Sequence, residues 1–194
     1  IHAWAAHIPG VKVVVPSTAG ECKGLLKTAI RDNDPVMFFE HKMLYTTKFN
    51  DVPEVEEDVC IPFGRARIVA EGADITVVTN SMMTIKAEKA VRQLQKEGIS
   101  AELIDLRTIV PLDTETIIRS VKKTGKLLIV DEGHLSFGIT GEIASRIMPD
   151  VFYDLDAPIQ RMGTADVPLP FSPALEFPLI PDEKKIAAKI REMV

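Results

Sequence analysis

The chain has 194 residues, of which 46% are hydrophobic and 26% charged, with a formal net charge of −5. This composition is typical of a globular protein that can bury a sizeable core. Acidic and basic residues are interspersed, which disfavours a nucleic-acid partner, and no apolar run reaches the ~18 residues of a membrane span. The two cysteines make neither a disulfide framework nor a metal cluster.

The first predicted elements are the end of a helix and a strand–helix–strand unit. Residues 2–8 end a helix at Pro9-Gly10. The β-branched run at 13–15 predicts a strand, and the apolar run at 36–39 predicts a second. Between them, Thr18 and Glu21 fit a capping box. The helix carries an apolar stripe of Leu25, Leu26, Ala29 and Ile30. A helix joining two strands predicts that the strands are parallel.

The rest of the chain predicts a second α/β region after a linker. Residues 51–64 are acidic, contain prolines and show no periodicity, so they are interpreted as the linker. Helices capped by Asp113 and by Pro181-Asp182 are expected, and residues 149–180 are expected to be irregular apart from one strand. The strand predictions are 65–70, 75–80, 101–106, 126–130 and 158–162, and the other helices are 83–98 and 138–148. Such alternation predicts a mostly parallel sheet flanked by helices.

The turn at 31–35 is the first candidate site. Asp32 and Asp34 follow the end of the predicted helix, where free carbonyl groups also point outward. Carboxylates and carbonyls are hard oxygen ligands suited to potassium, calcium or magnesium. Aspartate and asparagine are also common in ordinary turns after helices. On the residues alone, both interpretations stay open.

A second candidate follows the predicted strand at 126–130. Asp131, Glu132 and His134 lie where ligands bind in open α/β sheets, beyond the carboxyl end of a strand. Gly138 and Gly141 flank the next helix N-terminus, which could hold an anion. Neither a full GxGxxG motif nor a P-loop is present, so a glycine-rich turn with a solvated histidine is favoured.

The remaining histidines and cysteines give no catalytic set. His7 is expected to be packed and hydrogen-bonded at the end of the first helix, while His41 and Cys22 have no recognisable partner in the sequence. A GxSxG elbow and the ligand spacing of zinc sites are both missing. No residue of the chain is therefore assigned a catalytic or cofactor-binding role.

Several stretches resemble the beta subunit of thiamine-diphosphate-dependent 2-oxo acid dehydrogenases, a family that includes the pyruvate, branched-chain 2-oxo acid and acetoin enzymes. The resemblance begins with HAWAAHIPGVKVVVPSTAGECKGLLKTAIRDNDPVMFFEHKMLY. It continues through IDLRTIVPLD (104–113), KTGKLLIVDEG (123–133) and LDAPIQRM (155–162) to the C-terminus. It covers essentially the whole chain in order. Because the sequence starts without methionine, we expect a C-terminal fragment of such a subunit.

The resemblance implies a domain division and a metal site. Residues 1–50 would be the C-terminal part of a pyrimidine-binding α/β domain, 51–64 a linker, and 65–194 a transketolase-like C-terminal domain. Members of the family hold a structural potassium ion, whose ligands here would be Ala29, Ile30, Asp32 and Asp34. Asp34 stands where some members have asparagine, and further ligands would precede Ile1. The family's catalytic histidine also precedes this chain, and His2 does not match it.

The resemblance also implies an activity and partners. The enzyme would cleave a 2-oxo acid or acetoin and pass the acyl unit to lipoyl groups of a multienzyme complex. Thiamine diphosphate and magnesium would be held by the whole heterotetramer, so the fragment alone is expected to be inactive. Its partners would be an alpha subunit, a second beta subunit and the lipoyl acyltransferase core. The location would be the cytoplasm, or the mitochondrial matrix in a eukaryote.

Two alternatives remain open at this point. The chain could be the C-terminal half of a transketolase or deoxyxylulose-phosphate synthase, which match residues 29–42 less well. It could also be a non-catalytic assembly module. Apolar residues in the proline-rich tail predict a contact with a second copy of the chain, because exposed apolar patches mark interfaces. They are Phe171, Leu175, Phe177 and Leu179.

Overall fold

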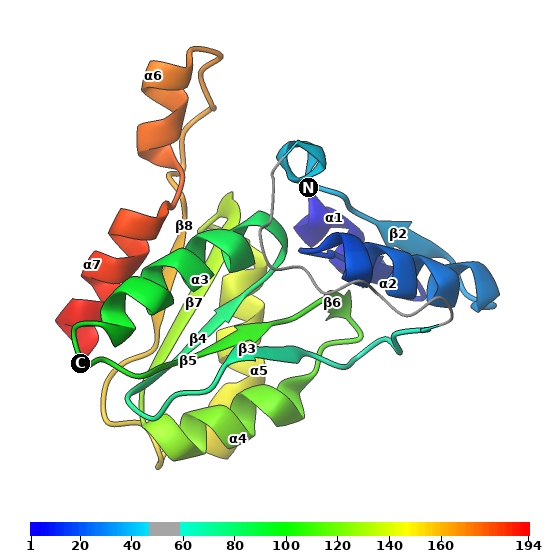
Figure 1. Ribbon diagram of the computed structural model, residues 1–194. Coiled ribbons are helices and arrows are strands. Elements are labelled where there is room, and N and C mark those ends of the chain that lie inside the picture. Colours follow the sequence, from blue (N-terminus) through cyan, green and yellow to red (C-terminus); the bar gives the residue numbers. More distant parts are fainter. Residues whose placement is uncertain (47–58) are drawn as a thin grey trace.

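The computed structural model describes residues 1–46 and 59–194, which form two sheets flanked by helices (Figure 1). The predicted linker, 51–64, lies outside the described residues as far as position 58. Its last residues, 59–64, contain no helix or strand, and the Ile61 backbone bonds to the helix at Gly24 and Thr28. The expected α/β class is confirmed.

The smaller sheet has the strand order β2-β1-β6. β1 (Lys12–Val14) pairs in parallel with β2 (Val36–Phe38), and α2 (Ala19–Arg31) joins them, as predicted. β6 (Thr108–Val110) pairs antiparallel with the other side of β1. β6 was not predicted, because three residues are too short to show a period. A strand from late in the chain therefore completes a sheet that begins near the N-terminus.

The larger sheet has the strand order β3-β5-β4-β7-β8. Its pairs β5-β4, β4-β7 and β7-β8 are parallel, and only the edge strand β3 runs antiparallel, beside β5. The prediction of a mostly parallel sheet is thus confirmed. The bounds are β3 Arg67–Ala70, β4 Ile75–Thr79, β5 Ala101–Asp105, β7 Leu127–His134 and β8 Gln160–Thr164.

Helices cover both faces of the larger sheet (Figure 1). α3 (Ser81–Gln95) and α7 (Glu183–Met193) pack on one face, with Leu94 and Ile190 wholly buried. α4 (Thr114–Thr124) and α5 (Ile139–Val151) pack on the other, with Ile117 and Ile143 inward. This second core also contains Ala5 of α1 (His2–Ala6), Val13 of β1 and the following Val15, so one apolar core bridges the two sheets.

The predicted helix ends are largely confirmed. Thr18, Asp113 and Asp182 each accept a hydrogen bond from the backbone N–H three residues on. Gly125 ends α4 with a φ of 69°, a left-handed conformation that glycine adopts without strain. The apolar stripe of α2 is buried only in part, because Ile30 is 75% exposed.

The proline-rich tail is more regular than predicted. It contains α6 (Pro173–Glu176) and the 3₁₀ turn η2 (Phe177–Leu179), where irregular structure was expected. Pro173 explains the error, because proline at the first position favours a helix start. β8 begins two residues later than the predicted strand at 158–162. α6 projects away from the rest of the chain (Figure 1).

Candidate functional site

The carboxyl ends of strands from both sheets meet at a buried polar region. Ser17 follows β1, Asp105 ends β5, and Asn80 follows β4. Asp131 lies within β7 at the same edge, and each of these four residues is at most 4% exposed. Polar residues gather here because the segments that follow the carboxyl ends of neighbouring parallel strands meet at one edge of the sheet. The region contains two separate hydrogen-bond networks.

The first network, the carboxylate joint, consists of Ser17, Glu21, Arg67, Asp105 and Arg107. Glu21 Oε2 accepts from Ser17 N at 3.2 Å and from Ser17 Oγ at 2.7 Å. Glu21 Oε1 accepts from Arg107 Nε at 2.8 Å. Ser17 Oγ also bonds to Asp105 Oδ2, and Arg107 N donates to Asp105 Oδ1 at 3.2 Å. The joint thus ties α2 to the end of β5.

Arg67 completes the carboxylate joint from β3. Its Nε lies 2.7 Å from Glu21 Oε1, and its Nη2 lies 3.4 Å from Asp105 Oδ2. The Arg67 Nε–H is buried and makes no hydrogen bond, so at this atom the guanidinium acts on Glu21 through its charge alone. Arg107 adopts a left-handed backbone with a φ of 59°, unusual for a residue with a side chain. That conformation brings its N–H and its guanidinium into the same cluster.

The two acids of the joint have opposite pKa shifts. Burial alone would raise the pKa of Glu21, but Arg67, Ser17 and Arg107 outweigh it and hold that pKa below its ordinary value. Burial and the charge of Glu21 raise the pKa of Asp105 to about 7. Sequence reasoning assigned Glu21 only to helix capping and did not predict the joint.

The second network surrounds Asp131. Its Oδ2 lies 3.0 Å from His2 Nε2 and accepts from Gly133 N at 3.1 Å, and its Oδ1 accepts from Asn80 Nδ2 at 2.9 Å. Burial opposes ionisation, but His2, Asn80 and the Gly133 N–H outweigh it and lower the pKa of Asp131. Asp131 is therefore an anion that ties α1 to β4 and β7.

A small cavity of about 170 Å³ lies beside this network, between the two sheets. His41 Nε2 contacts Glu132 Oε2 at 2.8 Å across it, a partner for His41 that was not recognisable in the sequence. Of the second predicted candidate, Asp131 and Glu132 both lie at this sheet edge, where Asp131 bonds to His2 and Glu132 pairs with His41. The structure places His134 elsewhere, exposed, with Nδ1 bonded to the Ala165 carbonyl at 2.8 Å.

Cys22 has a partner that the sequence did not reveal. Its Sγ donates to Glu40 Oε1 at 2.9 Å, and Tyr45 Oη donates to Glu40 Oε2 at 2.7 Å, in a cavity of about 510 Å³. Burial, followed by the Glu40 carboxylate, raises the pKa of Cys22 to about 12. Because the thiolate is the nucleophile, this raised pKa disfavours reaction of the Cys22 thiol near neutral pH.

The predicted metal turn holds an internal cation. Lys12 Nζ donates to both oxygens of Asp32, at 2.7 and 2.6 Å, and lies 3.1 Å from Asp34 Oδ2. The hydrogen bond between Lys12 and Asp32 lowers the pKa of the carboxyl and raises that of the amine. The ammonium group therefore occupies the face that these two carboxylates share, and the metal site stays a prediction. The main-chain carbonyls of Ala29, Ile30, Asp32 and Asp34 are the remaining candidate ligands.

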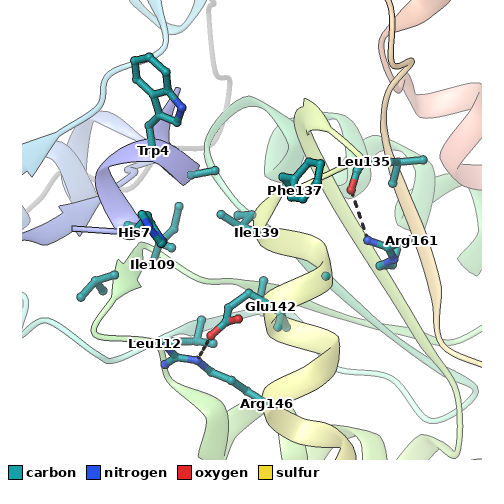
Figure 2. A pocket seen from close by; sticks show the side chains of 16 residues that line it. Trp4, His7, Ile109, Leu112, Leu135, Phe137, Ile139, Glu142, Arg146 and Arg161 are labelled. Atoms are coloured by element: carbon teal, nitrogen blue, oxygen red, sulfur yellow. Dashed lines mark hydrogen bonds and ion pairs between the residues drawn. The ribbon is translucent and has the colours of Figure 1, made fainter. Parts of the chain in front are cut away.

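A cavity of about 700 Å³ lies between α1, β6 and α5 (Figure 2). Trp4 and Phe137 stand at its rim and are 81% and 103% exposed. Arg146 is paired with Glu142 at 2.6 Å, and Arg161 Nη1 lies 3.4 Å from the Leu135 carbonyl (Figure 2). His7 lines the cavity and is exposed, so the expectation of a packed histidine is wrong.

Within residues 1–46 and 59–194, no three histidine, cysteine, aspartate or glutamate side chains converge as a metal-binding group. No helix of the same described ranges is long and apolar enough to cross a bilayer.

Comparison with known proteins gives two family matches. The transketolase pyrimidine-binding domain matches residues 1–48, and the transketolase C-terminal domain matches residues 64–186. The chain is 48% identical over 191 residues to the pyruvate dehydrogenase E1 component subunit beta of Rickettsia felis, covering 98% of this chain and 58% of the relative. It is 43% identical over 194 residues to the 2-oxoisovalerate dehydrogenase subunit beta of Bacillus subtilis, covering 100% and 59%.

A third relative is the acetoin:2,6-dichlorophenolindophenol oxidoreductase subunit beta of Cupriavidus necator, 47% identical over 186 residues, with 96% of this chain and 54% of the relative covered. The chain thus spans rather more than half the length of these relatives. A solved structure titled "Split gene transketolase, inactive beta4 tetramer" matches with a TM-score of 0.78 at 23% sequence identity. The match covers 99% of this chain and 60% of the solved chain, and it supports the fold. Since the C-terminal domain match alone spans more than half of the chain, this protein belongs to the transketolase family.

Proposed function

We propose that the chain is part of the beta subunit of a thiamine-diphosphate-dependent 2-oxo acid or acetoin dehydrogenase. The observation that carries this proposal is the 43–48% identity to beta subunits named for these activities, extending over nearly the whole chain. The assigned reaction is cleavage of the substrate and transfer of its acyl unit to lipoyl groups. The proposed location is the cytoplasm, or the mitochondrial matrix in a eukaryote.

The described residues by themselves do not fit thiamine diphosphate with magnesium. Glu21, in the first turn of α2, and Asp131, in β7, are the anionic acids of this region and are already bonded to Arg107 and His2, respectively. Among the described residues no acidic group converges to hold a divalent ion beside a diphosphate. We therefore assign the cofactor site to segments outside this chain and to an alpha subunit. The role of this chain is to hold the two sheets in a fixed relation beside that site.

The proposed division into residues 1–50, a linker at 51–64 and residues 65–194 follows from the same family. The proposed partners are an alpha subunit, a second beta subunit and the lipoyl acyltransferase core. Two apolar surfaces support such an assembly: the projecting tail with Phe171 and Leu175, and the cavity rim with Trp4 and Phe137. Monomers rarely expose apolar patches of this kind without a partner.

The direct test is a substrate panel with the full-length beta protein and its alpha partner. Pyruvate, branched-chain 2-oxo acids and acetoin are supplied with thiamine diphosphate, magnesium and a redox dye. Turnover of one of them, dependent on both subunits, is the expected result. Each subunit alone and the cofactor alone serve as controls. A pair that binds together but turns over none of these substrates would favour a non-catalytic assembly module.

A structural potassium ion is also proposed at the turn after α2. The ligands within this chain would be the main-chain carbonyls of Ala29, Ile30 and Asp32, with Asp34 contributing only through its backbone. This restriction follows from Lys12, which occupies the carboxylate face of Asp32 and Asp34. Carbonyl oxygens are suitable ligands for a hard cation.

A further inference from the structure

The contacts of the carboxylate joint require one more proton than two ionised acids can provide. Ser17 Oγ lies 2.7 Å from Glu21 Oε2 and is also within hydrogen-bond distance of Asp105 Oδ2. A serine hydroxyl has one hydrogen, so it can donate to only one of these oxygens. The other contact needs a second hydrogen between two oxygen atoms. Only a protonated carboxyl group can supply it, because an ionised carboxylate is an acceptor only.

The surroundings of the two acids decide which of them carries that hydrogen. Glu21 accepts from Ser17 N and from Arg107 Nε, and the charged Arg67 Nε lies 2.7 Å away. Asp105 is completely buried, accepts from Arg107 N at 3.2 Å, and accepts from Arg67 Nη2 only at the longer distance of 3.4 Å. Positive charge and donors therefore favour the anion at Glu21, whereas burial favours the neutral form at Asp105.

We propose that Asp105 stores a proton near neutral pH and donates it to Ser17 Oγ, which donates its own to Glu21, so that this proton fastens β5 to the start of α2. The opposite pKa shifts of the two acids agree with this assignment. The charged groups that face Asp105 are Glu21 from α2, Arg67 from β3 and Arg107 from the segment between β5 and β6. The proton passes to solvent when Asp105 ionises.

Ionisation weakens the joint for a reason visible in the contacts. After the proton leaves, Ser17 Oγ still has one hydrogen but faces two anionic oxygens. One of those two contacts becomes a repulsion between an oxygen lone pair and a charge. The Arg67 Nε–H, which has no acceptor in the protonated arrangement, can offset part of this repulsion by turning toward Asp105. We therefore expect the two sheets to be joined less tightly above about pH 7.

The pH dependence has a defined sign. Asp105 has an ordinary pKa of 3.8 when unfolded and about 7 when folded, so the folded state binds more protons between these values. The stability that its proton contributes is complete below 3.8 and is lost as the pH rises through about 7. Glu21 has the opposite dependence, because its pKa is lowered on folding. A variant that changes Asp105 alone is needed to separate the two.

Asp105→Asn is that variant, since the amide has a similar shape, donates a hydrogen bond and does not titrate. Urea unfolding of the full-length protein and the variant is compared from about pH 5 to about pH 9. The stability of the wild type relative to the variant is expected to fall with rising pH and to level off above about 7. Asp154→Asn, at an exposed aspartate, is the matched control and should leave the pH profile unchanged.

A direct measurement keeps the proposal testable if Asp105→Asn does not fold. Carbon-13 NMR of labelled aspartate in the wild type reports the protonation of Asp105, and Ser17→Ala assigns the signal by shifting it. We expect the chemical shift of the Asp105 carboxyl carbon to indicate a protonated carboxyl group at about pH 6 and to change near pH 7. The proposal would be overturned if this chemical shift titrated at or below pH 3.8. It would also be overturned if the stability difference between the wild type and Asp105→Asn did not depend on pH.

Discussion

At the scale of single residues, the turn after α2 shows how a chain can supply its own counter-ion. Lys12 begins β1, and its ammonium group reaches Asp32 and Asp34 in the turn between α2 and β2. The sequence indicated two carboxylates at a helix end, which fits a metal site. It did not reveal the lysine 20 positions earlier, because that proximity depends on the parallel pairing of β1 and β2.

This arrangement leads to a prediction about potassium. If the ion binds the carbonyls of Ala29, Ile30 and Asp32, the full-length protein should unfold at a higher temperature in potassium than in sodium at equal ionic strength. The physical reason is that an ion bound only by the folded state stabilises it. Differential scanning calorimetry measures the effect, with Lys12→Met as a companion variant. Equal melting temperatures of the wild type in both salts would count against the site.

The contacts of the buried acids could be predicted from the sequence only where the partners are close in the chain. The caps at Thr18, Asp113 and Asp182 were predictable because each bond joins residues three positions apart. The carboxylate joint was not, since Ser17 and Asp105 are 88 positions apart and meet only when two sheets pack end to end. A helix cap can be predicted from residues that are near one another in the sequence, whereas the carboxylate joint forms only in the complete fold.

At the scale of elements, helices and long strands followed their sequence patterns and short elements did not. The helices α3 and α4 matched their apolar stripes, and Met83, Leu94, Ile117 and Val121 are all buried. Most strands agreed within a few residues, because continuous apolar runs predict buried parallel strands. β6 and α6 were missed, since the three residues of β6 pair with a distant strand and are too few to show a period, and α6 is a four-residue helix that starts at a proline.

The two aspartate caps should differ in their contribution to stability. Asp113 caps α4 and also accepts from Ala66 N at 2.9 Å and Thr116 Oγ1 at 2.8 Å, in a buried position. Asp182 caps α7 by one bond to Lys185 N at 2.8 Å. Asp182→Ala should cost about 1 kcal/mol, the typical loss of a cap. Asp113→Ala should cost about 2–4 kcal/mol, because buried donors lose their acceptor.

Urea denaturation of the full-length protein measures both losses, with unchanged slopes as the check on two-state behaviour. Asp182→Ala is the matched control, since it removes a cap of the same residue type without the additional buried contacts. Equal losses for the two variants would show that the contacts to Ala66 and Thr116 contribute nothing beyond capping.

At the scale of the whole molecule, apolar side chains remain exposed where a single chain cannot cover them. Phe171 is 101% exposed, and Leu175 and Phe177 are more than half exposed on the projecting tail. Leu179, predicted with them, is partly buried against the body. The sequence predicted this surface because its apolar residues fall in a proline-rich stretch without a helical or strand period.

The tail therefore predicts the effect of a surface change on assembly. Phe171→Ser combined with Leu175→Ser should weaken self-association of the full-length protein in the presence of its alpha partner. The reason is that burial of such side chains contributes roughly 25 cal/mol per Å² of apolar surface. Sedimentation velocity at micromolar concentration measures the change. Tyr153→Ser, which removes an equally exposed aromatic ring elsewhere, should leave the assembly intact. Unchanged sedimentation of the double variant would contradict this role.

The insertion of β6 beside β1 has a consequence for how the chain is made. Val13 pairs with Val110, so β1 leaves the ribosome 97 residues before its antiparallel neighbour exists. At roughly 5–20 residues per second, that interval lasts about 5–20 s. During this time one side of β1 is an unpaired edge with apolar valines, a surface on which nascent chains can join one another. Slow synthesis of the region between them, or a stop before residue 108, would prolong that exposure, so chaperone demand should depend on translation speed there.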